Sequence, residues 1–222
     1  MCKMSDEELY SVAIHEAGHV VAANLLDLLI RGTEIYLSEK GRWFGKSPTN
    51  LSKKELVGIE RIFPPEFLFK NGAIVSVAGF LAQAKHAFMQ SHGTACLFDL
   101  TVDLAPLISF FRDSSLNDDV PGVAFVPFTV LSTGEARVCE LSGLNFSGAD
   151  RHFFLKNLQS APSASPELIV QESMQILDDR KNWRQVKELA TMLVEQEPTG
   201  DNQRRVLASE QISQLLSKDS IQ

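Results

Sequence analysis

The sequence has 222 residues and a formal net charge of −7, with 44% apolar and 22% charged residues. This length allows one large domain or two small ones with a full hydrophobic core, and the composition is that of ordinary globular proteins. The negative charge, with no run rich in lysine or arginine, argues against nucleic acid as a partner because phosphate binding requires a basic surface.

The sequence contains no signal for export or membrane anchoring. Its N-terminus, MCKMSDEELY, carries acidic residues where a signal peptide carries a basic and then an apolar run. The longest apolar stretches, such as residues 73–84, are shorter than the roughly 20 residues that span a bilayer. The cysteines Cys2, Cys96 and Cys139 are odd in number and widely spaced, which is typical of reduced thiols. We therefore expect a cytoplasmic protein without a membrane segment.

A long helix is predicted at the start of the chain. Ser5 and Glu8 form a capping box that begins a helix at about residue 6, and apolar residues recur at helical spacing to about residue 29. Gly18 lies inside this helix, where glycine costs about 1 kcal/mol relative to alanine. Its presence there indicates a packing reason for a residue without a side chain.

Two strands followed by three helices are then predicted up to residue 111. Residues 33–38 alternate polar and apolar side chains as a half-buried strand does, and Trp43-Phe44 begin a return strand. A short helix follows Ser52, and after Pro64-Pro65 a second long helix runs from about Glu66 or Asn71 to Gln90. The last predicted helix of this part covers residues 99–111.

The remaining sequence divides into two parts. Residues 112–160 are rich in Pro, Gly, Ser and Asp with short β-like runs, and we interpret them as an inserted irregular or β-rich segment. Residues 161–222 would complete the domain whose core is residues 1–111. They are predicted to form three helices, at about 166–179, 182–196 and 209–217. The expected fold is mainly α with a small β-sheet, of the α+β class.

The motif His15-Glu16-Ala17-Gly18-His19 carries the chemistry. Positions i and i+4 of an α-helix share one face, so both imidazoles can bind one ion, and zinc accepts nitrogen at about 2.0–2.1 Å. Glu16 lies about 100° around the axis, where it can reach a water in the open coordination position as a general base. Apolar residues flank the motif on both sides, and unpartnered imidazoles there would cost free energy. We predict a zinc site with ligands His15 and His19.

A catalytic zinc ion normally has a third protein ligand. Glu39 has a suitable separation from His19 but lies in a predicted strand end and turn. His92 and Cys96 follow the second long helix, and each can bind zinc. Asp99 lies at the start of the next predicted helix, where it could also serve as an N-terminal cap. These residues alone leave the third ligand open.

Several segments resemble the M41 peptidases, the protease domain of FtsH-type AAA+ proteases. AIHEAGHVVAA is similar to the zinc-binding helix of that family, and EIYLSEKGRWFGKS to its strand-and-glycine segment. VSVAGFLAQAKHAF resembles its small-residue helix, and TACLFDLTVDLAPL the loop and helix that carry its aspartate ligand. The resemblance implies that Asp99 is the third ligand, with Asp103 as the reserve, in a zincin-type metallopeptidase domain.

The resemblance also implies a function. It predicts a zinc-dependent endopeptidase that cleaves unfolded or extended polypeptides. The substrate would add along the strand of Glu34, Ile35, Tyr36 and Leu37, near Gly45. No P-loop is present in the chain, so we expect a stand-alone domain that could receive substrate from a separate ATPase or delivery partner. The oligomeric state stays open.

Two alternatives follow from departures from the family. The family's Gly-Gly-Arg-Ala-Ala-Glu-Glu pattern is replaced by Ala78-Gly79-Phe80-Leu81-Ala82-Gln83-Ala84, without its arginine and acids. Together with the segment 112–160, this change is compatible with an M41-like binding or regulatory protein of weak or no activity. The other alternative is a zinc hydrolase of another class with Glu39 as the third ligand.

Overall fold

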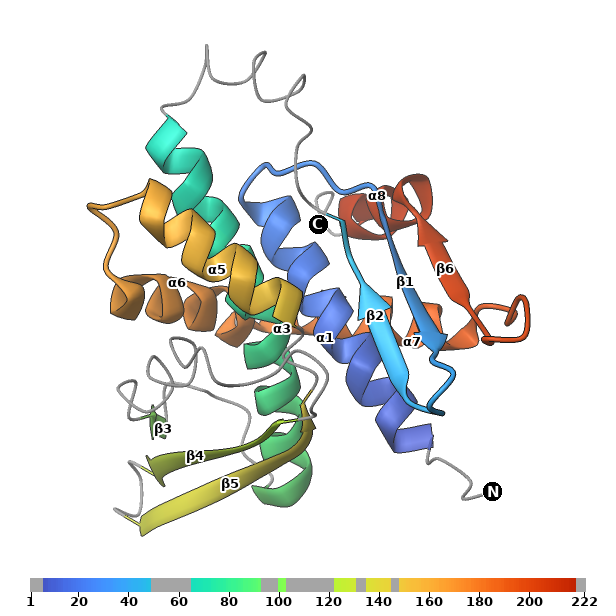
Figure 1. Ribbon diagram of the computed structural model, residues 1–222, viewed down its shortest axis with the longest axis horizontal. Coiled ribbons are helices and arrows are strands. Elements are labelled where there is room, and N and C mark those ends of the chain that lie inside the picture. Colours follow the sequence, from blue (N-terminus) through green and yellow to red (C-terminus); the bar gives the residue numbers. More distant parts are fainter. Residues whose placement is uncertain are drawn as a thin grey trace.

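The computed structural model describes residues 6–48, 65–92, 100–102, 122–130, 135–144 and 148–218. Within these ranges the protein is mainly helical and contains two small antiparallel sheets (Figure 1). This arrangement confirms the α+β class expected from the sequence.

Helix α1 (Asp6–Leu25) lies at the centre of the molecule, between the sheet of β1, β2 and β6 and the helices α3 and α5 (Figure 1). Three acidic residues in its first turn complement the helix dipole. The helix ends before the predicted residue 29 because Asp27 adopts a left-handed conformation with φ of 53°. The amide of Leu28 then donates to the Ala23 carbonyl at 2.9 Å, which closes a Schellman-type cap.

The sheet beside α1 has the strand order β2-β1-β6. Strand β1 (Gly32–Leu37) pairs antiparallel with β2 (Trp43–Lys46), as the sequence predicted, and on its other side with β6 (Arg205–Ala208). Strand β6 was not predicted, because four residues with only Leu207 buried carry too weak a pattern. Strand β1 is therefore the central strand of this sheet.

Helix α3 (Pro65–His92) crosses α1 and contacts α5 and α6. Its stretch Glu66–Ala87 is long and apolar enough to cross a membrane by length and composition, and 67% of that window is buried inside the protein. This apolar stretch is longer than the sequence pattern indicated, and in this structure most of it lies in a core helix that other helices cover.

Two sequence predictions between residues 99 and 160 are wrong. Residues 100–102 form strand β3 (Leu100–Val102) rather than helix, since they pair with β4 (Gly122–Val130). Helix α5 (Gly148–Ser160) lies in the segment expected to be irregular or β-rich. It is helical because Phe154, with Leu155 and Leu158 beside it, packs into the core. The β-like runs of the same segment form β4 and β5 (Glu135–Leu144) as expected.

The C-terminal helices agree with the sequence prediction to within about two residues. They are α6 (Pro166–Asp178), α7 (Arg180–Glu195) and α8 (Ser209–Lys218). Ser165 caps α6 by accepting from the amide of Leu168, and Asp179 caps α7 by accepting from the amide of Asn182. Helix α7 packs against α1 and α6 and closes the main core.

Candidate metal centre

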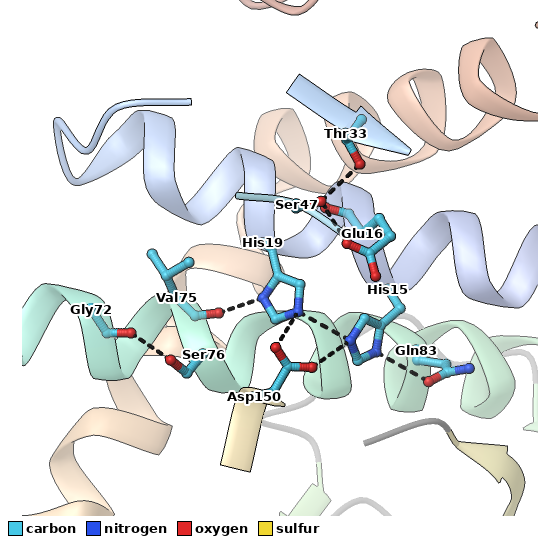
Figure 2. A network of polar contacts seen from close by, with 10 residues as sticks. All are labelled: His15, Glu16, His19, Thr33, Ser47, Gly72, Val75, Ser76, Gln83 and Asp150. Carbon is cyan, nitrogen blue, oxygen red and sulfur yellow. Dashed lines mark hydrogen bonds and ion pairs between the residues drawn. The ribbon is translucent and has the colours of Figure 1, made fainter. Parts of the chain in front are cut away.

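Two histidines of α1 and one aspartate of α5 converge on a single point (Figure 2). His15 and His19 are 4% and 5% exposed, and their Nε2 atoms lie 3.0 Å apart. Asp150, in the first turn of α5, places Oδ2 at 3.1 Å from His15 Nε2 and Oδ1 at 3.4 Å from His19 Nε2. These three residues form a buried group that could bind a metal ion.

Hydrogen bonds on the far side of each imidazole determine which nitrogen faces this point. The Nδ1–H of His19 donates to the Val75 carbonyl at 2.7 Å, and Nδ1 of His15 lies 3.3 Å from Gln83 Oε1. With a proton on each Nδ1, both Nε2 atoms of the neutral rings direct lone pairs at each other. Two lone pairs and a carboxylate at such distances require a cation between them, which can be a proton or a metal ion.

The donor set fits a zinc ion. In a tetrahedral site with bonds of about 2.1 Å, ligand atoms lie about 3.4 Å from each other. The two Nε2 atoms are 3.0 Å apart, and the Asp150 carboxylate places one oxygen 3.1 Å from His15 and the other 3.4 Å from His19, which are all close to that value. Two neutral imidazoles and one carboxylate are also the usual nitrogen and oxygen ligands of a catalytic zinc site that keeps one position open.

The pKa values reflect the same convergence in the metal-free protein. Burial lowers the pKa of His19, but the Asp150 carboxylate beside it outweighs this effect and raises the pKa to about 9. Burial acts on Asp150 in the opposite sense, and the charge and hydrogen bonds of the two histidines hold its pKa well below the usual range. A protonated His19 and an ionised Asp150 thus form an ion pair when no metal is bound.

Glu16 lies beside this group and is oriented by two hydroxyls (Figure 2). Ser47 Oγ, just after β2, donates to Glu16 Oε2 at 2.6 Å. Because that uses the only proton of Ser47, the hydroxyl of Thr33, 2.7 Å away, donates to Ser47. Burial raises the pKa of the Glu16 carboxyl above its ordinary value, while the histidines and the Ser47 hydrogen bond lower it.

Two glycines make room for these side chains. A Cβ on Gly45 of β2 would lie 2.3 Å from Glu16 Cγ and Oε1, and a Cβ on Gly79 of α3 would lie 2.4 Å from His19 Nε2. Any larger residue at position 79 would occupy the space in front of the His19 ligand atom. The absence of side chains at these positions is therefore part of the site.

The other ligand candidates from the sequence do not join this group. Asp99, Asp103 and Cys96 lie outside the described residues, as does the side chain of His92. Glu39 lies in the exposed turn between β1 and β2, away from the histidines. His86 packs edge-on against Tyr10, and His152 is exposed. Neither histidine belongs to the metal group.

Asp150 was missed because it falls in the segment predicted to be irregular. The one local signal was an acidic residue at the beginning of the apolar run 153–155, which is typical of the first turn of a helix. That signal could have indicated helix α5, but not its position beside His15, which is 135 residues away in the sequence. Ser47 and Thr33 were missed because no sequence motif connects either residue to Glu16.

The predicted substrate strand needs a correction. Residues Glu34 to Leu37 belong to β1, which β2 covers on one side and β6, with the Asn202 carbonyl, on the other, so β1 has no free edge for an added peptide. The Glu34 carboxylate forms an ion pair with Arg204 instead, and Tyr36 stacks on Phe44. Among the described residues, the edge strand next to the metal group is β2, which contains Gly45.

Comparison with the models of known protein families and with curated proteins found no match for this chain. The chemistry of the site is therefore inferred from its own residues and their geometry.

Proposed function

We propose that this protein is a zinc-dependent endopeptidase of the zincin type, similar to the M41 peptidases, that hydrolyses extended or unfolded polypeptides. One observation carries the proposal: the Nε2 atoms of His15 and His19 lie 3.0 Å apart, the Asp150 carboxylate lies within 3.4 Å of each, and the Glu16 carboxyl lies beside them. The sequence motif by itself supplies only two ligands and a base. The third ligand, from α5, completes the donor set that a catalytic zinc ion needs.

His15, His19 and Asp150 hold the zinc ion in this proposal. The bound ion supplies a Lewis acid that lowers the pKa of a coordinated water to about 7 and polarises the substrate carbonyl. Glu16 would act as the general base that takes a proton from the water attacking the peptide carbonyl carbon, and it would return that proton to the departing amine. Burial raises the pKa of Glu16 toward the working pH, which suits a group that must both take up and release a proton.

The substrate class follows from the strand next to the site. Strand β2 is at the end of its sheet in the described part of the chain, and its Gly45 contacts Glu16. A peptide in extended form that adds to the free edge of β2 would bring its main chain past Glu16 and the metal. A folded substrate cannot present such a strand, so the expected substrates are unstructured segments, which a separate ATPase could deliver.

Replacement of Glu16 tests the mechanism. Glu16→Gln removes the general base and keeps a side chain of the same size, so casein cleavage should fall about a thousandfold while one zinc per chain is retained. Metal content by mass spectrometry and casein cleavage with a fluorescent label measure the two effects. Glu7→Gln, on an exposed position of the same helix, is the matched control and should cleave at the parent rate. Equal cleavage by Glu16→Gln and the parent would contradict the mechanism.

A further inference from the structure

We propose that Gln83 is a positioning residue for the metal: it selects the tautomer of His15 and fixes the orientation of its ring through a hydrogen-bonded chain from Ser11. This inference rests on the metal site of the proposed function and adds a residue that the zinc motif does not contain. Gln83 is 3% exposed and lies on α3, opposite the histidines of α1 (Figure 2). We infer that it acts on the metal through His15, which its side chain faces.

The hydrogen bonds that connect Ser11, Gln83 and His15 have a defined donor-to-acceptor direction. Gln83 Nε2 donates to Ser11 Oγ at 2.8 Å, which leaves Gln83 Oε1 to face His15 Nδ1 at 3.3 Å. The reverse orientation of the amide would direct its NH₂ group at Nδ1, and the ring would then carry its proton on Nε2, where the metal must bind. Ser11 lies one turn before His15 on α1, so the two partners of the amide share one helix face.

Helix α3 thus supplies the hydrogen-bond partner of Nδ1 for both histidines, a main-chain carbonyl for His19 and a side-chain amide for His15. The Nδ1–H of His19 donates to the main-chain carbonyl of Val75, which no substitution removes. The corresponding acceptor for His15 is a side chain, so its contribution can be measured. The amide is neutral, and it orients His15 without adding a third negative charge beside the buried Glu16 and Asp150.

Zinc affinity tests this role without any need for cleavage activity. In the metal-free full chain, Gln83→Met preserves the side-chain volume and removes the acceptor, and it should weaken zinc binding about 10- to 100-fold. Gln83→Glu keeps an oxygen acceptor for His15 Nδ1, so it should bind zinc more tightly than Gln83→Met does. Ser11→Ala leaves the amide free to rotate and should cause a smaller loss than Gln83→Met. Competition with a chromophoric chelator measures all three affinities.

Asn71→Leu is the matched control, because Asn71 is also a buried amide of α3, about three helical turns before Gln83, and it donates to the Leu26 carbonyl rather than to a histidine. It should leave zinc affinity unchanged. Equal affinity of Gln83→Met and the parent, or an equal loss in Gln83→Met and Asn71→Leu, would overturn the inference. If Gln83→Met does not fold, nitrogen NMR of the metal-free parent decides, because no metal then dictates the tautomer: a proton on His15 Nδ1 supports the role, and a bare Nδ1 refutes it.

The outcomes also separate this inference from the proposed peptidase activity. A parent protein whose zinc affinity depends on Gln83 but which does not cleave casein would refute the peptidase proposal and support the positioning role. A parent protein that binds no zinc would refute both.

Discussion

Asp150 is the residue on which the identity of the third ligand depends. The family resemblance implied Asp99, whereas the structure brings Asp150 to both histidines. We expect Asp150→Ala to weaken zinc binding about a hundredfold or more, because it removes one of the three ligands that we propose for the ion. Asp99→Ala should bind zinc within about threefold of the parent. Chelator competition measures both affinities. If Asp99→Ala loses more zinc affinity than Asp150→Ala, the third ligand is Asp99 and not Asp150.

The His19–Asp150 ion pair predicts how zinc binding depends on pH. In the metal-free protein Asp150 raises the pKa of His19 to about 9, so near neutral pH a proton occupies His19 and zinc must displace it. Apparent zinc affinity should therefore rise by up to about tenfold per pH unit from about pH 6.5 to about pH 8.5 and level off above the pKa. Calorimetry in buffers of different ionisation enthalpy should also detect released protons at neutral pH. A constant affinity over this range, with no proton release, would contradict the ion pair.

The His19–Asp150 ion pair also predicts how the stability of the metal-free fold changes with pH. A raised histidine pKa stabilises the metal-free fold fully below the unfolded value of about 6.5, and this contribution is lost as pH rises through about 9. The lowered pKa of Asp150 acts in the opposite direction, since its contribution is present above the ordinary value and is lost in acid.

At the scale of elements, the crossing of α1 and α3 positions the site. Gly18 of α1 allows the close approach: a Cβ there would lie 2.6 Å from Ala82 Cβ and 2.8 Å from the Ala78 carbonyl oxygen. The packing reason that the sequence suggested for Gly18 is therefore contact with α3. This contact also brings Val75 and Gln83 within reach of the two histidines.

We expect Gly18→Ala to lower the free energy of unfolding by about 1–3 kcal/mol, although alanine is the better helix former, because the main chain of α3 must move. Gly72→Ala on α3 is the matched control. The atoms nearest to its new Cβ belong to the Asn157 side-chain amide, which can rotate away, so stability should change by less than about 1 kcal/mol. Urea unfolding measures both variants. Equal effects of the two substitutions would show that helix propensity, rather than the crossing, determines stability here.

At the scale of the whole molecule, two lysines of α3 connect it to α6. Lys85 is 2% exposed, donates to Asp178 at 2.6 Å and to the Leu177 carbonyl at 2.8 Å, and lies over the Trp183 ring of α7. Lys70 forms an ion pair with Glu172 at 2.6 Å, but both side chains are about one-third exposed. The buried interaction joins three helices, whereas the exposed one lies on the surface.

We expect Lys85→Met to lower the free energy of unfolding by about 3 kcal/mol, since it leaves the largely buried Asp178 carboxylate without its main cation. Lys70→Met should cost less than about 1 kcal/mol because water screens that pair. Thermal and urea unfolding test the difference. Both variants should retain zinc affinity, and a loss of zinc binding in Lys85→Met would mean that the α3–α6 contact also positions the histidines.

The sequence by itself determined the features that one element contains. The i, i+4 spacing of His15 and His19 and the apolar periodicity of α1 depend only on helix geometry. The predicted pairing of β1 with β2 was also correct, because a short turn joins neighbouring strands. These features are local, and a local pattern is sufficient to predict them.

Only the tertiary structure decided which distant residues meet. Asp150 reaches the histidines because Phe154 packs α5 into the core, and β1 loses its free edge because β6 arrives from about 170 residues further along the chain. Gln83 and Ser47 come to His15 and Glu16 by the packing of α3 and β2 on α1. The physical reason is that such contacts form when apolar faces of distant elements pack together. The residue pattern within one element does not show which other element will cover its apolar face.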